Sequence, residues 1–496
     1  MEHTTDIAIE SGFVTIATFW GYLGLMILIG IFATKFSSKG INNFFIGDRK
    51  MNKLVVAMSA VVSGRSAWLL LGVTGMAYKM GISAIWAAVG YILAEFWLFF
   101  SYAPRIRRFS EKYDCITITD FYSERFSDKK SILRIITVII ILLFMISYLS
   151  AQFVAGGKTF STSFNISSNE GLLATAAIIL FYTVLGGFLA VSLTDTIQGF
   201  FMLFALLALP IIAIFKLGGI SNFWNAALSI GGSNFGSLSA ISLETLIGFL
   251  GIGLGSAGNP HIVVRYMSID KTKNLSQVAF IGTIMNILMA VGAVFTGIAA
   301  RIYFPEASML PGGDVENAYP ALAAYKFSPL IFGIVISSIF AAIMSTADSQ
   351  LLVAASCIVR DIYQKILKRN IEIPQENLVL LSRITILIIV GISLFLAFFA
   401  KNIVFWLVLF AWGGLGAAFG PTSILMLFWK KTTRTGVIAG IIAGAFTVIV
   451  WNQIPTLKSF VYELIPGFFV SLIVTIIVSL LTKDNDEQKY FDALSS

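Results

Sequence analysis

The sequence predicts an all-α integral membrane protein with thirteen transmembrane helices. Of its 496 residues, 57% are hydrophobic and only 12% are charged, against about 25% charged in an ordinary soluble domain. A bilayer-spanning helix needs roughly 20 mostly apolar residues. Runs of this kind fill the chain with no soluble domain between them, and they lie at 13-34, 54-78, 82-103, 132-155, 170-192, 197-216, 241-264, 276-300, 327-356, 378-400, 403-428, 433-450 and 460-482.

The first apolar run is a helix of the mature chain, because it is too long for a cleaved signal peptide and follows the acidic Asp6 and Glu10. Cytoplasmic loops collect Lys and Arg. Under strict alternation, 26 of the 34 basic residues fall on one side and seven on the other, while Arg65 lies inside span 2. We therefore expect the plasma (inner) membrane, with the N-terminus outside and the C-terminus in the cytoplasm.

Composition and charge exclude several classes of protein. The net charge of +8 comes from short loops rather than one basic face, so nucleic acid is not a predicted partner. His3 and His261 are the only histidines, and Cys115 and Cys357 fit no metal or disulfide spacing. Acid/base or metal catalysis therefore lacks its parts, and the sequence predicts neither an enzyme nor an organic cofactor.

Three charged residues are predicted inside the membrane, namely Arg65, Glu95 and Asp348. Such a charge costs from about 2.5 to more than 10 kcal/mol unless it faces a partner or a water-filled cavity. Glu95 lies toward the cytoplasmic end of span 3, where its side chain can reach the interface. Arg65 and Asp348 lie in mid-span, and they either pair directly or are satisfied separately by carbonyls, hydroxyls or water.

Two spans carry helix-breaking residues. Span 2 contains the small polar stretch Ser63-Gly64-Arg65-Ser66, and span 7 contains GIGLGSAGNPH, residues 251-261. Non-helical backbone at membrane depth is tolerated where it lines a cavity or is buried in protein. Close packing of small residues between helices is the alternative.

Interrupted spans in corresponding positions of two halves indicate a transporter site between inverted repeats. Spans 2 and 7 are five apart. We therefore predict an N-terminal peripheral helix and loop at 1-53, a first five-helix repeat at 54-216, a second inverted repeat at 241-428, and two peripheral helices with a cytoplasmic tail at 429-496.

Span 9 carries hydroxyls at helical spacing, with Ser345, Thr346 and Ser349 following Ala342. Hydroxyls and freed carbonyls are the oxygen ligands that a hard cation such as sodium prefers. The same hydroxyls can instead bond their own helix.

The chain resembles the sodium:solute symporter family, and most closely its sodium/proline symporter branch. The resemblance covers nearly the whole chain and rests on a series of motifs in order. These are DRKMNKLVVAMSA, ILRIITVIIILLF, VLGGFLAVSLTDTIQG, GNPHIVVRYM, AAIMSTADSQLLV and AWGGLGAAFGP. It implies a LeuT-type core of two inverted five-helix repeats and secondary uptake of a small organic solute.

The resemblance also implies a sodium site. Its ligands would be the backbone oxygens of Val62 and Arg65 with Ala342, Ser345 and Thr346. The proline branch carries an Asp followed by an apolar residue where this chain has Gly64 and Arg65. A guanidinium turned into the site would repel sodium by about 4 kcal/mol at 4 Å and an effective dielectric of 20.

The solute site is expected between the span 2 break, span 4 and the span 7 break. Trp68 and Tyr148 match aromatic residues of the proline branch, whereas Ile252 and Ser256 stand where that branch has Trp and Tyr, which favours an amino acid or carboxylate other than proline. The predicted lining residues are Ser63, Arg65, Ser66, Trp68, Tyr148, Gln152, Ser256 and Asn259.

Two coupling mechanisms are compatible with the sequence. In the first, sodium drives uptake while Arg65 is held by Asp348 or binds an anionic part of the solute. In the second, Arg65 replaces the ion, and the protein exchanges solutes or couples to protons through Asp348. Arg65 could also be a structural lock on the broken helix.

Asp195 matches an acid that influences ion use in the family, although a helix N-cap is an equal alternative. A transporter-like sensor is a further alternative. The expected partners are the solute and the lipid bilayer.

Overall fold

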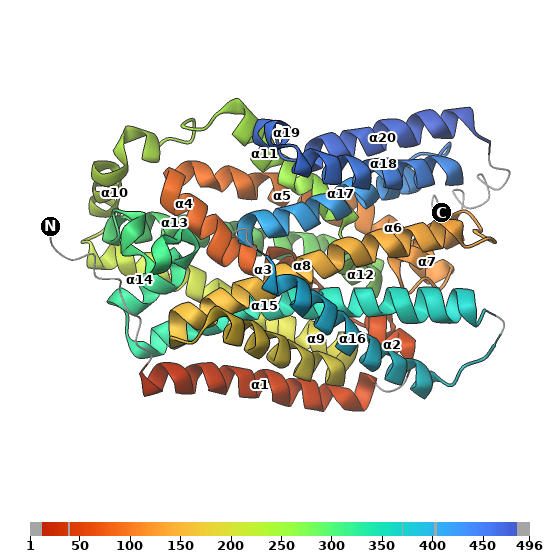
Figure 1. Ribbon diagram of the computed structural model, residues 1–496, viewed down its shortest axis with the longest axis horizontal. Coiled ribbons are helices and arrows are strands. Elements are labelled where there is room, and N and C mark those ends of the chain that lie inside the picture. Colours follow the sequence, from red (N-terminus) through yellow and green to blue (C-terminus); the bar gives the residue numbers. More distant parts are fainter. Residues whose placement is uncertain (1–11, 38–39, 370, 401–403, 484–496) are drawn as a thin grey trace.

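The computed structural model describes residues 12-37, 40-369, 371-400 and 404-483. Long helices run side by side along one axis, with α1 at one edge and α18 and α20 at the opposite edge (Figure 1). Within the described ranges, the strand-like pairing is a single parallel bridge between Met51 and Ile269. The molecule is therefore a bundle of helices, as the sequence predicts.

The α-helices have the following bounds: α1 Phe13–Ser37, α2 Ile41–Ile46, α3 Lys53–Ala67, α4 Thr74–Met80, α5 Trp86–Trp97, α6 Ala103–Lys112, α7 Ile118–Arg125, α8 Ile132–Phe164, α9 Ser168–Lys216, α10 Ile220–Phe235, α11 Leu243–Gly251, α12 Pro260–Ser268, α13 Leu275–Tyr303, α14 Ala318–Lys326, α15 Pro329–Ser356, α16 Gln375–Phe398, α17 Val404–Phe428, α18 Arg434–Gln453, α19 Pro455–Phe460 and α20 Leu464–Leu481.

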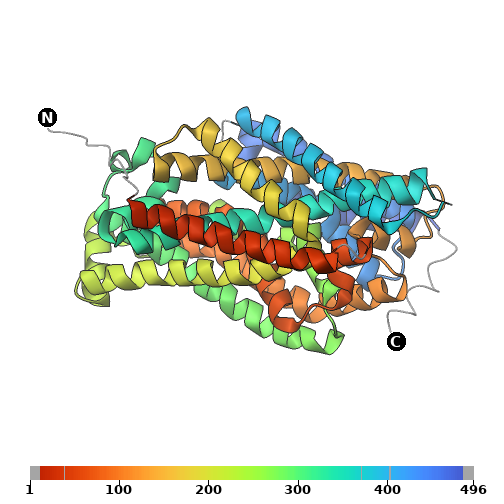
Figure 2. The same cartoon turned by 90° about the horizontal axis from the view of Figure 1, so that it is seen from below.

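By length and apolarity, ten helices of the described chain can cross a membrane, or eleven if the bent pair α11 and α12 is one span. The stretch Lys53–Lys112 counts as one of them, although it contains the predicted spans 2 and 3. Ser168–Val184 is counted as a shorter apolar helix. The number thirteen thus stays a prediction. The first turn of α1 and the last turn of α20 lie at opposite ends of the bundle (Figures 1 and 2).

The connection between predicted spans 5 and 6 differs from the expectation of a loop at 193-196. α9 extends from Ser168 to Lys216 with a kink at Gly187, where φ is 58°. Asp195 therefore lies inside a helix. The N-cap alternative for Asp195 was wrong, because a cap residue has non-helical backbone at a helix start.

α15, which corresponds to predicted span 9, is the central helix. Every residue from 335 to 357 is buried, as expected for a helix that is apolar on all sides. It packs against α1, α3, α8 and α9. Outer helices such as α16 and α20 instead expose large apolar side chains, including Leu387 and Leu480, which suits contact with lipid.

Both predicted helix breaks are present. In span 2, Ser66 has a φ of 48° and a ψ of −171°, and a π-helical turn, Trp68–Val73, follows. In span 7, α11 continues into a 3-10 segment, Ile252–Gly258, and α12 then leaves at an angle of 52°. Asn259 between them has extended backbone, so carbonyls near the middle of both spans are released from regular helix bonding.

Glycine in the span 7 break allows the backbone to approach α17. A Cβ atom at Gly258 would lie 2.5 Å from the carbonyl oxygen of Leu415 and 2.7 Å from the Cα of Gly416. Because both neighbours are backbone atoms, they cannot move aside cheaply.

Replacing Gly258 with Ala is therefore expected to destabilise the protein by about 1–3 kcal/mol through overpacking. Gly391→Ala in α16 is the matched control, because no atom lies within 4 Å of its Cβ position; it should be neutral or stabilising by up to about 1 kcal/mol. Thermal unfolding of the purified protein in detergent measures both. Equal midpoints for the two variants would contradict a close backbone contact at Gly258.

Candidate solute and ion site

Arg65 stands one residue before the span 2 break and is paired with Glu95 of α5. Its Nη2 donates to Glu95 Oε1, its Nε donates to the carbonyl of Val61 at 3.3 Å, and its guanidinium carbon lies 3.7 Å from the centre of the Tyr91 ring. The two charged residues are 1% and 2% exposed. Arg65 is thus neutralised inside the bundle by a neighbouring helix.

This pairing corrects two expectations. Glu95 does not reach an interface, because its residue is buried and its carboxylate also accepts from Asn286 Nδ2 at 2.8 Å and from Ser256 Oγ at 3.5 Å. The direct pair between Arg65 and Asp348 was also wrong. Glu95 instead joins α3, α5, the 3-10 segment of span 7 and α13 at one point.

A small cavity of about 10 Å³ lies beside Arg65, which is close to the space that one water molecule needs. Buried polar atoms without a hydrogen-bond partner occur at its wall and next to it, including Trp68 Nε1, Tyr91 Oη and Gln152 Nε2. Such atoms cost free energy when they are left unpaired, which makes this cavity the best candidate for a solute site. Its lining residues are Gly64, Arg65, Trp68, Tyr91, Tyr148, Ile252, Val408, Leu409 and Trp412.

The structure brings Arg65, Trp68 and Tyr148 of the predicted solute site together at this cavity. Other predicted liners serve the helix breaks around it: Ser66 Oγ accepts from Trp68 N at 3.1 Å, Gln152 Oε1 accepts from Ala67 N at 3.3 Å, and Asn259 Nδ2 donates to the carbonyl of Gly255 at 2.8 Å. Ser63 points elsewhere, toward a second polar cluster.

That second cluster surrounds Arg265 of α12, which is 1% exposed. Its Nη2 contacts Asp195 Oδ2 at 3.3 Å and donates to Ser349 Oγ, and its Nε donates to Ser59 Oγ at 3.0 Å. Ser59 donates in turn to Asp195 at 2.6 Å, and Ser63 donates to the same carboxylate at 3.3 Å. Asp195 thus binds side chains of span 2 and α12 directly, and Arg265 links it to Ser349 of span 9.

Asp348 is joined to this cluster through Ser349, whose hydroxyl lies 3.1 Å from Asp348 Oδ1. Tyr182 of α9 donates to Asp348 Oδ2 at 2.7 Å. Both predicted coupling acids are therefore buried in one network, although Arg265 contacts only Asp195 among them in a direct ion pair.

The predicted sodium ligands lie where α15 meets the span 2 break. Thr346 Oγ1 donates to the carbonyl of Ser63 at 3.0 Å, and Ser345 Oγ donates to the carbonyl of Ala342 at 3.2 Å. Ser63 is the neighbour of Val62, whose carbonyl is a predicted ligand. One contact, from Thr346 to the Ser63 carbonyl, therefore joins the two helices here, while the Arg65 guanidinium is bound to Glu95.

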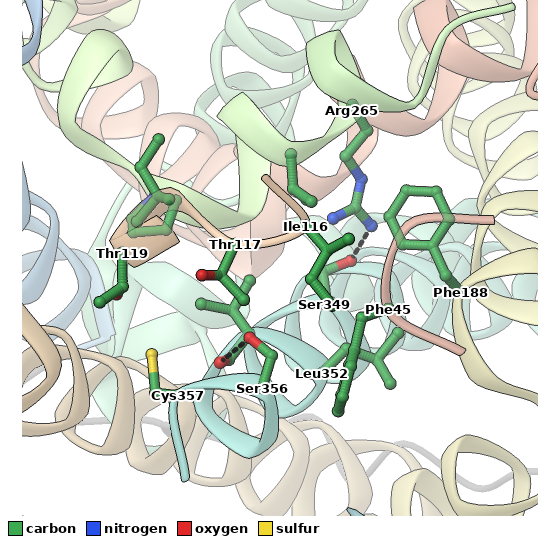
Figure 3. A pocket seen from close by; sticks show the side chains of 14 residues that line it. Phe45, Ile116, Thr117, Thr119, Phe188, Arg265, Ser349, Leu352, Ser356 and Cys357 are labelled. Atoms are coloured by element: carbon green, nitrogen blue, oxygen red, sulfur yellow. Dashed lines mark hydrogen bonds between the residues drawn. The ribbon is translucent and has the colours of Figure 1, made fainter. Parts of the chain in front are cut away.

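A narrow cavity of about 20 Å³ lies on the other side of Arg265. Figure 3 shows the guanidinium directed at Ser349 with the Phe188 ring beside it, and Phe45, Thr117 and Ser356 farther along the wall. At the opposite end of the bundle, a cavity of about 810 Å³ opens between α11, α17 and α19. Ile252 and Leu409 line both this large cavity and the small cavity beside Arg65.

Near the narrow cavity, a cluster of ion pairs ties α7 and α8 to the segment after α15. Arg134 binds both Asp120, at 2.8 Å, and Asp361, while Arg360 Nε lies 3.2 Å from Asp120. Burial raises the pKa of Asp120, but the positive charges of Arg360 and Arg134 outweigh it, so the net pKa is lowered. Ion pairs therefore hold these three segments together at this end of the bundle.

Sequence reasoning missed Arg265, Tyr91 and Trp412. Arg265 lies one residue beyond the predicted end of span 7 and was counted with the cytoplasmic basic residues. Tyr91 is one helical turn before Glu95, a spacing that could have suggested a shared face. Trp412 donates to the carbonyl of Ile252 at 2.9 Å, and so satisfies backbone freed in the span 7 break.

Comparison with known proteins places these features in a family. The model of the sodium:solute symporter family matches residues 44–444. The osmoregulated proline transporter OpuE of Bacillus subtilis is 37% identical over 95% of both chains. The sodium/proline symporter of Escherichia coli is 38% identical over 94% of this chain and 93% of that protein.

Among solved structures, that of a Na⁺-coupled sialic acid symporter superposes with a TM-score of 0.81 and 21% identity over 96% of this chain and 99% of the other. A nucleobase-cation-symport-1 family transporter gives a TM-score of 0.54 at 13% identity, over 91% and 98%. At these identities the likeness concerns the fold, which is the LeuT-type arrangement of inverted repeats.

Tyr182→Phe tests the buried network. Removing the hydroxyl takes a donor from the Asp348 carboxylate, and we expect a loss of about 1.5–3 kcal/mol in stability. Tyr319→Phe is the control, because its buried hydroxyl bonds the neutral Ser338 at 3.0 Å; about 0.5–1.5 kcal/mol is expected. Thermal unfolding compares the two, and an equal or smaller loss for Tyr182→Phe would contradict the role given to Asp348.

Proposed function

Because the chain belongs to the sodium:solute symporter family, we propose that it takes up an amino acid or related carboxylate together with sodium, through a site between the broken spans 2 and 7. The chain is a multi-pass membrane transporter and not an enzyme. The observation that carries the proposed coupling is the ion pair between Arg65 and Glu95. It removes the objection that Arg65 takes the place of the ion.

The charges at the centre of the bundle favour binding of a cation. Counted in their ordinary ionised forms, the carboxylates of Glu95, Asp195 and Asp348 face the guanidiniums of Arg65 and Arg265, which leaves one negative charge in excess. All five residues are at most 2% exposed. Since an uncompensated buried charge is costly, one monovalent cation would restore neutrality.

We place the sodium at the junction of α15 with the span 2 break. Its ligands there would be the carbonyls of Val62, Arg65 and Ala342 and the hydroxyls of Ser345 and Thr346. The bond from Thr346 to the Ser63 carbonyl supports this position, because it already holds the two helices at contact distance. Asp195 and Asp348 would act beside it as coupling acids, because their two carboxylates face the single guanidinium of Arg265.

The solute is proposed to bind at the cavity beside Arg65, against Trp68 and Tyr148. In the predicted orientation, the large cavity between α11, α17 and α19 opens to the outside, and Ile252 and Leu409 form the partition between it and the solute site. The narrow cavity beside Arg265 then lies toward the cytoplasm. Movement of the broken helices against α15 would expose the site to each side in turn.

Sodium and the membrane potential supply the driving force. One charge crossing at 100 mV provides about 2.3 kcal/mol, which corresponds to about fifty-fold accumulation at tenfold per 1.4 kcal/mol. Two mechanisms compete with this one: proton coupling through Asp348, and exchange against a second solute.

Uptake of labelled amino acids into proteoliposomes separates these mechanisms. Accumulation should require an inward sodium gradient and persist when an uncoupler removes the proton gradient. Thr346→Ala should raise the sodium concentration for half-maximal uptake by about tenfold or more, since it removes a direct ligand. Ser337→Ala is the control on the same helix, because its buried hydroxyl bonds the carbonyl of Gly333. Uptake that ignores sodium, or that needs a counter-solute, would refute the proposed coupling.

A further inference from the structure

The ion pair between Arg65 and Glu95 has features that a purely structural pair does not need. Gly64 and Arg65 line the small cavity themselves. Arg65 Nε and Nη2 donate to Val61 and Glu95, and neither of these bonds uses Nη1. A guanidinium presented in this way suits a carboxylate, which accepts charge-assisted hydrogen bonds from it.

Glu95 stands behind a gap that only glycine leaves open. Its Oε1 lies 3.9 Å from the position that a Cβ would occupy on Gly64, and Gly64 is part of the cavity wall. A side chain at residue 64 would stand in van der Waals contact with the carboxylate, which does not itself line the cavity. Because Gly64 has none, an ammonium group in the cavity can approach Glu95 after a small displacement of Arg65.

The charge count limits which solutes can use this site. The pair is neutral as a unit, so a solute that engages both members must itself carry one negative and one positive group. A solute with a carboxylate alone would separate Arg65 from Glu95 and leave the Glu95 carboxylate unpaired, and an amine alone would do the same to Arg65. Both results carry the penalty of a buried unpaired charge.

The remaining wall is aromatic and apolar. Trp68 stacks on Phe405 with ring centres 5.7 Å apart and meets Tyr91 edge to face at 6.1 Å. The unpartnered Trp68 Nε1 and Tyr91 Oη offer further hydrogen bonds near the same point. The site therefore combines two opposite charges with an aromatic wall, and its cavity of about 10 Å³ must widen to admit a small amino acid, whose apolar side chain the rings would contact.

We propose that Arg65 and Glu95 are the specificity-determining pair of this carrier: Arg65 binds the carboxylate and Glu95 the ammonium group of a zwitterionic solute, and their mutual ion pair closes the site when no solute is bound. This inference rests on the proposed function and names the group in the chain that selects the solute. No bond is made or broken; one ion pair is exchanged for two.

Isosteric probes that lack one charge test the proposal. L-proline is compared with cyclopentanecarboxylate and pyrrolidine, and L-leucine with 4-methylpentanoate and isopentylamine. Binding to the full chain in nanodiscs, in sodium, is measured as the concentration that raises the unfolding temperature. The wild type should bind at least one amino acid, and bind it at least about 100-fold more tightly than both of its analogues.

Three variants assign the two charges. Glu95→Gln should weaken amino acid binding by about 10- to 100-fold and abolish the preference over the carboxylate analogue. Arg65→Gln should abolish the preference over the amine. Gly64→Ala should weaken amino acid binding by covering Glu95 while leaving the ion pair intact; its Cβ would meet Ile262 Cδ1 at 3.1 Å, a side-chain end that can move.

Either single-charge variant can fail to fold, because it leaves its partner unpaired. The double variant Arg65→Met, Glu95→Gln removes both charges and keeps the proposal testable: it should fold and lose the preference for amino acids. Asp361→Asn is the control, since this buried carboxylate binds Arg134 and Thr117 beside the narrow cavity, and Arg134 keeps Asp120 as its partner; it should keep the preference.

A double variant that binds amino acids as tightly as the wild type would overturn the proposal and leave the pair as a structural lock. Equal wild-type affinity for an amino acid and its single-charge analogue would also overturn it, as would binding of neither amino acid. In the first two cases, sodium-dependent uptake and a sodium-induced rise in unfolding temperature would persist, so that failure of this inference is distinguishable from failure of sodium coupling. Where neither amino acid binds, the sodium-induced rise in unfolding temperature makes that distinction.

Discussion

Five charged side chains buried at the centre of a helix bundle must be balanced among themselves, and this constraint determines the rest of the site. In a medium of low dielectric, an unpaired carboxylate or guanidinium costs several kcal/mol. Glu95 therefore holds Arg65, and Arg265 holds Asp195, while hydroxyls from Ser59, Ser63, Tyr182 and Ser349 supply the remaining bonds. If all three carboxylates are ionised, one negative charge is in excess, and in the proposed mechanism a sodium ion balances it.

The broken helices provide the geometry for this balance. A continuous helix uses its carbonyls internally, whereas the interruptions at Ser66 and at Ile252–Gly258 release backbone oxygens near the centre of both spans. The buried helix α15 is the surface against which both are held, through Thr346 and Ser349. The Arg65 cluster beside Trp68 and the Arg265 cluster are separate, and both contact the broken spans 2 and 7.

The sequence was sufficient to predict the helical membrane fold, the family and both breaks, because glycine, proline and a run of small polar residues have strong local preferences. It also placed Arg65, Trp68 and Tyr148 at one site, through the family resemblance. The sequence could not predict which side chains pair with Arg65 and Arg265. Periodicity relates residues on one helix, but the choice of Glu95 rather than Asp348 for Arg65 depends on how α3 and α5 pack. Arg265 was missed because hydropathy ended span 7 one residue too early. Asp195 was predicted as a coupling residue, but its place inside α9 was not, because a helix kinked at Gly187 was interpreted as two helices with a loop at 193-196.

The charge moved per solute is the most direct test of sodium-coupled uptake through this buried site. Proteoliposomes are adsorbed on a solid-supported membrane, with the same pH inside and outside. The transient current after an amino acid is added together with sodium measures this charge. Symport of one sodium ion predicts a net inward movement of one positive charge for each zwitterionic solute, because a single cation compensates the excess carboxylate. Solute entry without any charge movement would contradict it, since the buried site would then have no unbalanced charge to fill.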